Sequence, residues 1–313
     1  MLCRNISPPD SATAELDSQG MLKSCHCERS EAISLNTDEK VNRLFRGDML
    51  DVAPLLARES FRLIYLDPPF ATGREKQGTR DGMVYDDRWR GDLDSYLPWL
   101  KERLQVLCGL LYCDGSLVLH LDWRASHYAR VMLDEIFGRQ GFINEIIWHY
   151  TGGGRSKSRF SCKHDTLLWY SRHPRPIFNL DAVRVPYKRT SGFAKGGIVA
   201  ASGRHYQPDP RGTPVDDVWD IPIINPLANE RVGYPTQKPL ALMQRLIVAL
   251  SNPGELVGDF CCGSGTTLVA AQKLGRNWVG CDISEAATAC VVSRLCDECG
   301  LAGIVPAEVG GSR

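Results

Sequence analysis

Four consecutive residues at the end of an apolar run are the first candidates for chemistry: Asp67, Pro68, Pro69 and Phe70. They follow Phe61–Leu66, whose composition predicts a buried strand. The two prolines restrict the backbone, so the carboxylate, the main chain and the aromatic ring would form a small rigid platform. Such a platform can hold a flat amine between hydrogen-bond acceptors and a stacking ring. A plain strand-ending turn is the alternative interpretation, because Asp-Pro and Pro-Pro dipeptides are common in turns.

A glycine-rich turn at residues 263–265 is the second candidate, because it joins a predicted strand to a predicted helix. Missing side chains at such a turn let a ligand lie against the main chain. The following strand ends at Asp282, 23 residues after Asp259, where a carboxylate can accept hydrogen bonds from a ribose diol. The pattern therefore predicts a nucleotide-like cofactor.

A dinucleotide site is the natural competitor for this turn, and three features count against it. The turn reads G-S-G-T-T rather than G-x-G-x-x-G, and it lies near the C-terminal end of the chain. Asp259 precedes the turn, where its carboxylate would repel a pyrophosphate but attract an ammonium or a sulfonium. S-adenosylmethionine fits these charges better.

The segment Asp259–Thr267 resembles the S-adenosylmethionine motif of the DNA amino-methyltransferases, D-P-F-x-G-S-G-T-T. Phe260-Cys261 stands where that motif has Pro-Phe, so we expect a different apolar cap beside the cofactor. The segment Tyr234–Pro239 resembles the stretch that precedes the motif in this family. The resemblance implies a set of cofactor-binding residues: Thr236, Gln237, Lys238, Asp259, Phe260, Cys261, Gly263, Ser264, Gly265, Thr266 and Asp282.

The residues Asp67–Phe70 match the catalytic tetrad of the same family, D/N/S-P-P-Y/F. The chemistry explains the residue types, because the lone pair of an exocyclic amine is delocalised into its ring. A carboxylate and the Pro68 carbonyl, each accepting one N–H bond, would draw the nitrogen toward tetrahedral geometry and stabilise its developing positive charge. Phe70 would stack on a base that has flipped out of the helix. The 5-methylcytosine route is excluded, because the chain has no Pro-Cys dipeptide to supply its nucleophile.

The tetrad precedes the cofactor motif, and in the family this permuted order marks the β group. Methyltransferases for RNA or protein glutamine usually carry Asn-Pro-Pro-Tyr after the cofactor motif, so order and first residue both argue against them. Because the tetrad begins with Asp67, the resemblance implies transfer to adenine N6 in duplex DNA. A cytosine-N4 methyltransferase and a catalytically silent DNA-binding relative stay open as alternatives.

Alternating strands and helices predict an α/β fold, a Rossmann-like methyltransferase domain with a mostly parallel sheet and helices on both faces. The pattern predicts strands at 61–66, 116–121, 142–150, 256–260 and 277–281, a turn at Asp114-Gly115, and helices at 93–111, 126–137, 239–250, 266–274 and 285–296. We expect residues 42–150 to form the catalytic half and 234–313 the cofactor half. Residues 1–41 lack periodicity and are expected to be a disordered extension, part of which looks like a translated intergenic repeat.

Residues 151–233 interrupt the pattern with Gly, Pro, Ser and Arg, and are expected to be an irregular target-recognition insert. From Tyr150 to Arg231 there are thirteen Lys and Arg against seven Asp and Glu, although the whole chain has no net charge. A basic segment in an otherwise acidic protein indicates contact with a polyanion, and a solvated loop surface is the alternative. The candidates for phosphate contact are Arg155, Lys157, Arg159 and Lys163.

Composition limits the remaining possibilities. The chain has 313 residues, 43% hydrophobic, and no apolar run long enough to span a membrane. Twelve cysteines in a chain of this size favour free thiols in a reducing cytoplasm over a disulfide framework. A zinc site built from Cys25-His26-Cys27 and Cys296-x-x-Cys299 is disfavoured by their separation, so no metal is expected. A homodimer agrees with the family analogy, and the sequence leaves open both this pairing and a cognate restriction endonuclease as a further partner.

Overall fold

The computed structural model describes residues 42–72, 76–77, 84–85, 92–152 and 154–310. Nine strands of this part form one sheet in the order β10, β6, β7, β5, β2, β11, β12, β1, β13. β7 runs antiparallel to β5 and β6, and every other neighbouring pair is parallel. The predicted fold class, α/β with a mostly parallel sheet, is confirmed.

The strands of this sheet are β1 (Arg43–Arg46), β2 (Phe61–Leu66), β5 (Leu111–Leu121), β6 (Phe142–His149), β7 (His164–Ser171), β10 (Val218–Asp220), β11 (Leu256–Asp259), β12 (Asn277–Asp282) and β13 (Ala307–Glu308). Two short ribbons pair β3 (Lys76–Gln77) with β4 (Val84–Tyr85) and β8 (Ile198–Val199) with β9 (His205–Tyr206). The α-helices are α1 (Met49–Val52), α2 (Leu93–Cys108), α3 (Ser126–Phe137), α4 (Gly192–Gly196), α5 (Leu240–Leu250), α6 (Thr266–Lys273) and α7 (Glu285–Cys299). Three 3₁₀ turns cover Ala53–Leu55, Arg139–Gly141 and Leu180–Val183.

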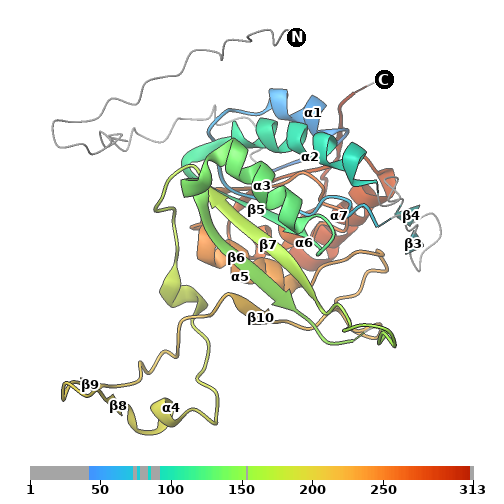
Figure 1. The fold of residues 1–313 in the computed structure, drawn as a ribbon. Helices are drawn as coiled ribbons and strands as arrows, with labels where there is room; N and C mark the ends of the chain where they lie inside the picture. Colours follow the sequence, from blue (N-terminus) through green and yellow to red (C-terminus); the bar gives the residue numbers. More distant parts are fainter. Residues whose placement is uncertain (1–41, 73–75, 78–83, 86–91, 153, 311–313) are drawn as a thin grey trace, which may run out of the picture. The chain divides into compact units, whose positions relative to one another are not determined.

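Helices cover both faces of the sheet, as the alternating pattern predicts (Figure 1). Helices α1, α2 and α3 pack on one face, where Leu100 and Leu104 join a core with Leu117 of β5. Helices α5, α6 and α7 pack on the other face, where Leu246 joins Leu63 of β2. The central strands are therefore buried on both sides, which explains why β2 is an almost continuous apolar run.

The two predicted motifs lie side by side because β2 and β11 are neighbours in the sheet. They run parallel with Tyr65 opposite Asp259, so both chains leave the sheet at the same edge. The chain after β2 leads to α2 on one face, whereas the chain after β11 leads to α6 on the other. Such a divergence opens a crevice at the carboxyl ends of the strands, where ligands of α/β proteins bind.

The boundary between α2 and β5 differs from the prediction. The helix ends at Cys108 rather than Leu111, and Leu111 begins β5. The predicted turn at Asp114-Gly115 lies inside this strand, where the register against β2 shifts between Phe61 and Leu63. A Cβ on Gly115 would come within 2.6 Å of the Phe61 carbonyl oxygen, so this glycine permits a bulge rather than a chain reversal.

The expectation of an irregular chain throughout 151–233 is wrong at β7. Residues 164–171 form a central strand, and all of it except His164 is buried. The glycines before this apolar run and the prolines after it favoured the interpretation of the whole segment as irregular. The boundaries of the recognition insert stay a prediction, and the expected extension at residues 1–41 lies outside the described residues. Within the described ranges, no helix is long and apolar enough to cross a membrane.

Candidate active site

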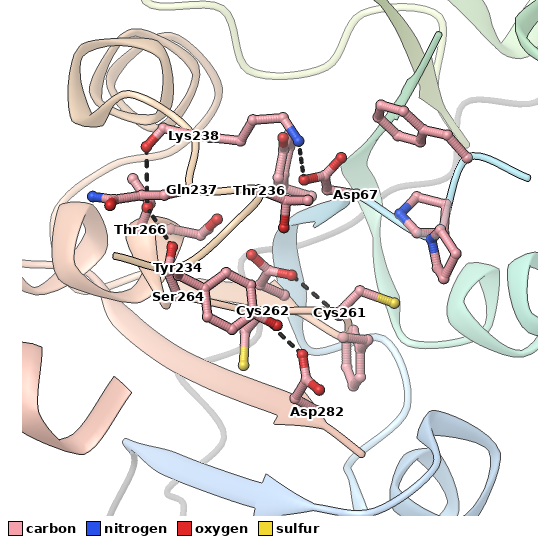
Figure 2. Close-up of a pocket in the computed structure, with 18 of the residues that line it drawn as sticks. Asp67, Tyr234, Thr236, Gln237, Lys238, Cys261, Cys262, Ser264, Thr266 and Asp282 are labelled. Carbon is pink, nitrogen blue, oxygen red and sulfur yellow. Dashed lines mark hydrogen bonds and ion pairs between the residues drawn. The ribbon is translucent and has the colours of Figure 1, made fainter. Parts of the chain in front are cut away.

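A cavity of about 700 Å³ opens at the carboxyl ends of β2, β11 and β12. Its lining includes fourteen of the fifteen residues predicted for catalysis and cofactor binding: Asp67, Pro68, Pro69, Phe70, Thr236, Gln237, Lys238, Asp259, Phe260, Cys261, Gly263, Ser264, Thr266 and Asp282. Gly265 is the exception, and it lies at the start of α6. The fold thus brings both motifs and the segment before α5 to one cavity (Figure 2).

Asp67 uses its two carboxylate oxygens differently. Oδ2 forms an ion pair with the Lys238 ammonium, and both side chains are largely buried. Oδ1 is buried and has no hydrogen-bond partner among the described residues. The Lys238 nitrogen also lies 5.2 Å from the centre of the Phe70 ring. A buried acceptor without a donor is costly unless a ligand supplies one, so Oδ1 is suited to receive an N–H group.

The chain just after the tetrad is held in an unusual conformation. Ala71 has a φ of 54°, in the left-handed region that residues with a Cβ rarely adopt, and its side chain is fully buried. Packing in the core therefore stabilises a turn that the local sequence disfavours. Strain of this kind is found where a site must be held in one geometry.

A buried polar network behind Asp67 was not predicted from the sequence. Nδ1 of His120 lies 2.6 Å from the Tyr65 hydroxyl and 3.9 Å from Asp67 Oδ1. Nε2 lies 3.3 Å from Oδ2 of Asp165, whose Oδ1 accepts a hydrogen bond from the Tyr150 hydroxyl. His120 is completely buried on β5, and Asp165 is buried on β7. A histidine inside the apolar run Leu117–Leu121 was the available signal.

Burial sets the protonation of this network. It raises the pKa of Tyr65 well above its ordinary value, and the nearby carboxylates of Asp67, Asp259 and Asp165 raise it further. The Tyr65 hydroxyl therefore keeps its proton, and it lies within hydrogen-bond distance of His120 Nδ1. Burial alone would raise the pKa of Asp165, but its hydrogen bond and charge interaction with His120 hold it below the ordinary value.

The glycine turn holds Asp282 against the main chain. Gly263 N–H donates to Asp282 Oδ2 over 2.8 Å, and Ser284 N–H donates to Oδ1 over 2.9 Å. Gly263 has a φ of 49°, and a Cβ there would meet the Tyr234 ring at 3.2 Å. Gly265 has a φ of 75°, and its Cβ would meet Val291 of α7 at 2.8 Å. Both positions therefore require glycine, one beside the cavity and one for helix packing.

Buried Asp259 and partly buried Asp282 place two carboxyl groups on the cavity wall. Burial raises the pKa of Asp259 to about 7, and the charges of Asp67 and Asp282 add to that effect. Burial also raises the pKa of Asp282. A bound cation would offset this cost. The thiols of Cys261 and Cys262 have pKa values raised well above the ordinary value, first by burial, so they stay protonated and are poor nucleophiles.

The segment before α5 is fixed by its own hydrogen bonds. The Gln237 amide nitrogen donates to the Glu230 carbonyl over 2.7 Å, and its amide oxygen accepts from Val232 N–H over 2.9 Å. Thr266 Oγ1 donates to the Lys238 carbonyl over 3.2 Å, which ties the segment to the glycine turn. Gln237 therefore shapes the cavity wall, and its implied role beside the cofactor stays a prediction.

Arg294 of α7 holds the glycine turn through buried hydrogen bonds. This role was not predicted from the sequence. Nη1 of Arg294 donates to the Ser264 carbonyl over 2.9 Å and to Thr266 Oγ1 over 3.0 Å. Its Nε donates to Glu298 Oε1 over 2.7 Å. The side chain is only 2% exposed, so a buried cation fixes the glycine turn. Nothing in the local pattern of α7 distinguishes Arg294 from a surface arginine.

The four candidates for phosphate contact lie together in the loop between β6 and β7. Arg155, Lys157 and Arg159 are exposed. The ammonium of Lys163 instead donates to the carbonyls of Gly152 and Gly154, the latter over 3.0 Å. Lys163 therefore stabilises the loop in this structure. No group of three or more His, Cys, Asp or Glu side chains suited to a metal ion occurs among the described residues.

Comparison with known proteins decides the family. The sequence profile described as "DNA methylase" matches residues 61–292, which include both motifs and the segment between them. The chain belongs to this family of N6/N4 DNA methyltransferases. The suspected family is confirmed, and because the family depends on S-adenosylmethionine, so is the predicted cofactor.

Curated relatives of the DNA methylase chain agree with this assignment. It is 29% identical over 244 residues to the Type II methyltransferase M.HpaI of Haemophilus parainfluenzae, covering 78% of this chain and 70% of that protein. It is 29% identical over 257 residues to M1.MboII of Moraxella bovis, covering 78% and 93%. It is also 29% identical over 244 residues to the DNA adenine methyltransferase YhdJ of Escherichia coli (strain K12), covering 77% and 78%.

Solved structures show the same fold. PvuII DNA methyltransferase, described as cytosine-N4-specific, superposes with a TM-score of 0.58 at 19% identity, covering 80% of this chain and 85% of that chain. TTHA0409 of Thermus thermophilus, solved in complex with S-adenosyl-L-methionine, gives 0.55 at 20% identity, covering 87% and 99%. These likenesses support the fold of the DNA methylase and do not select its target base.

Proposed function

We propose that this DNA methylase transfers a methyl group from S-adenosylmethionine to the exocyclic N6 of adenine in double-stranded DNA. The observation that carries the proposal is the buried Asp67 Oδ1, an acceptor without a donor among the described residues, on a side chain that lines the cavity. The adenine activity given in the name of YhdJ, 29% identical to this chain, supports the same target.

The cavity fits the proposed cofactor. The carboxylates of Asp259 and Asp282 line it, and their raised pKa values show that each would gain from a positive charge nearby. Beside them, Gly263 leaves the main chain accessible, because it has no side chain. When bound, S-adenosylmethionine supplies an electrophilic methyl group on a positively charged sulfur. Asp259 and Thr266 would face its methionine part, and Asp282 would accept hydrogen bonds from its ribose.

The tetrad acts on the adenine amine. Asp67 Oδ1 accepts one N–H bond and the Pro68 carbonyl accepts the other, so the nitrogen lone pair is directed at the methyl group. Positive charge would develop on the amine as its bond to the methyl group forms and the sulfur–methyl bond breaks, which leaves a neutral thioether. The Asp67 carboxylate would stabilise that charge and accept the released proton. Phe70 lies beside this position and offers its ring for stacking. Cys261 and Cys262 stay protonated, which fits direct transfer without a covalent enzyme intermediate.

Exposed basic residues support DNA as the substrate. A basic arm, residues 186–208, carries four Lys and Arg and no Asp or Glu. It contains α4 and the β8–β9 ribbon, which extend away from the sheet (Figure 1). A bridge between Val185 and Thr213 closes its base. Such an arm can follow the phosphate backbone of a duplex and hold it over the cavity.

The test is methylation-sensitive sequencing of DNA from a methylation-free host that expresses the chain. We expect N6-methyladenine at one recurring short sequence. An Asp67→Ala variant with the melting temperature of the wild type should leave that sequence unmodified. Methylation that appears on cytosine N4 instead would overturn the adenine assignment, and modification by the Asp67→Ala variant would overturn the role of the tetrad.

A further inference from the structure

A loop with internal hydrogen bonds lies beside the active site and exposes a phenylalanine to solvent. We define the Phe160 loop as residues 154–163, which lead into β7. Within it, Ser156 N–H donates to Ser161 Oγ over 2.9 Å, and Ser156 Oγ accepts from Arg159 N–H over 3.2 Å. The Lys163 ammonium contacts the carbonyls of Gly152 and Gly154 at the base. These bonds fix the shape of the tip without using the phenyl ring.

Phe160 itself contributes nothing to the fold. Its side chain is 100% exposed, the highest value among the large hydrophobic residues of the described chain. The next aromatic residue in that ranking, Tyr128, is 56% exposed. A phenyl ring that is wholly exposed to water gains no burial energy from folding, so it is available to contact a partner molecule.

The position of Phe160 indicates what it contacts. A second cavity of about 440 Å³ is lined by Phe160, Trp123 and Arg159, and it shares Tyr150 and Asp165 with the main cavity. The ring therefore lies next to the place where a flipped base would enter. A DNA duplex positioned over the main cavity would therefore also come near Phe160.

The surroundings of the ring carry the chemistry of nucleic-acid contact. The Arg159 guanidinium lies 5.5 Å from the centre of the Trp123 ring, and the Arg124 guanidinium lies 4.8 Å from it. Arg124 is paired with Asp122, but exposed Arg155, Lys157 and Arg159 add positive charge around the tip. The Trp123 ring flanked by two arginines, together with the exposed Phe160 ring on the same cavity, offers aromatic and cationic contacts of the kind that suit bases and phosphates.

We propose that Phe160 inserts into the base stack of duplex DNA beside the target adenine and holds open the space that the flipped base leaves. This positioning role rests on the proposed function, because it requires a base to leave the helix. Apolar side chains that enter between base steps offset the loss of stacking. Phe160 would thus lower the cost of extruding the adenine, while Asp67 and Pro68 perform the chemistry once the base is bound.

The test compares two duplexes that carry the sequence found by sequencing. One duplex has thymine opposite the target adenine. The other has an abasic site opposite it, so the adenine has no base pair that flipping must break. Labelled S-adenosylmethionine reports kcat/KM for the wild type, Phe160→Ala, Phe160→Trp and the control Val305→Ala. Val305 is an exposed apolar residue near the C-terminus and does not line either cavity.

We expect Phe160→Ala to lower kcat/KM on the matched duplex about 30-fold, and on the abasic duplex less than about threefold. Phe160→Trp and Val305→Ala should stay close to the wild type on both. Equal activity of Phe160→Ala and the wild type on the matched duplex would overturn the inference, and so would an equal loss on both duplexes. If the wild type methylates neither duplex, the proposed function fails first and the inference fails with it.

Discussion

The Lys238 ammonium pairs with Asp67 Oδ2 and leaves Oδ1 of the same carboxylate without a hydrogen-bond partner among the described residues. The two residues are 171 positions apart, and the fold joins them because β2 and the chain before α5 meet at the cavity. The pair orients the carboxylate, so that one oxygen is held and the other faces the position proposed for the amine. This division of roles is the basis of the proposed mechanism.

Removing the ammonium should slow methyl transfer. Lys238→Met leaves the main-chain carbonyl that Thr266 contacts, but it frees Asp67 to rotate and leaves its charge uncompensated. We expect kcat to fall about tenfold. The matched control is Lys101→Met, which removes an exposed ion pair between α2 and Glu135 of α3, does not touch the cavity lining and should leave kcat unchanged. Steady-state methylation of DNA measures both, and an undiminished rate in Lys238→Met would refute the orienting role.

Cofactor binding should strengthen as the pH rises toward neutrality. The pKa of Asp259 is about 7 in the folded protein against an ordinary value of 3.8, so the carboxyl is mostly protonated below pH 7. A cationic cofactor favours the ionised form, and its apparent affinity should rise about tenfold between pH 5.5 and 7. Calorimetric titration with S-adenosylmethionine measures this slope. Asp259→Asn should bind weakly with no such slope, whereas a slope that persists in the variant would assign it to another group.

The same raised pKa has a consequence for stability. Between about pH 4 and 7 the folded protein retains a proton on Asp259 that the unfolded chain has lost, so the cofactor-free fold is destabilised as the pH rises through this window. The contribution of Asp259 to stability is thus complete below pH 4 and absent above pH 7. Its effect is opposite to that of a salt-bridged carboxylate, whose contribution is lost in acid.

The glycine at the start of α6 should tolerate no side chain. Gly265 and Gly254 both have left-handed backbones, with φ values of 75° and 82°. A Cβ on Gly254 meets nothing within 4 Å, whereas one on Gly265 meets Val291 at 2.8 Å. We expect Gly254→Ala to cost about 1 kcal/mol of unfolding free energy and Gly265→Ala about 3 kcal/mol. Urea denaturation compares the two, and equal losses would show that backbone strain alone explains them.

His120 should affect the rate of transfer without affecting cofactor binding. It contacts Tyr65 and Asp165 and lies near Asp67, but it does not line the cavity and takes no part in the contacts of the glycine turn with Asp282. We expect His120→Gln to lower kcat about tenfold, with the Kd for S-adenosylmethionine changed less than about twofold. Single-turnover kinetics and calorimetry separate the two quantities. A proportional loss of cofactor affinity would indicate general disruption of the buried core.

Much of the site could be predicted from the sequence because its chemistry is local. The tetrad and the glycine turn each combine a strand end with residues that few other turns require. Parallel strands then place both at one edge of the sheet. Proline, glycine and aspartate carry this information in their own backbone preferences, so no knowledge of distant residues is needed to find them.

The supporting residues could not be predicted in this way, because their roles depend on the tertiary structure. His120 and Asp165 meet only because β7 pairs with β5, and the sequence around β7 had suggested an irregular chain. Arg294 supports the turn from α7, a contact across 30 residues of sequence. The bulge at Gly115 depends on the carbonyl of Phe61 in the neighbouring strand. Each of these is a long-range contact, and the local periodicity of the sequence does not predict it.

Identification of the methylated nucleoside tests the central claim most directly. Unmethylated duplex DNA would be incubated with the purified chain and labelled S-adenosylmethionine, digested to nucleosides and separated by mass spectrometry, with Asp67→Ala as the control. The proposed geometry of Asp67 predicts that the label appears in N6-methyl-2′-deoxyadenosine with the wild type. With the Asp67→Ala variant, we expect no labelled nucleoside. Label in N4-methylcytosine, or no transfer by the wild type, would contradict it.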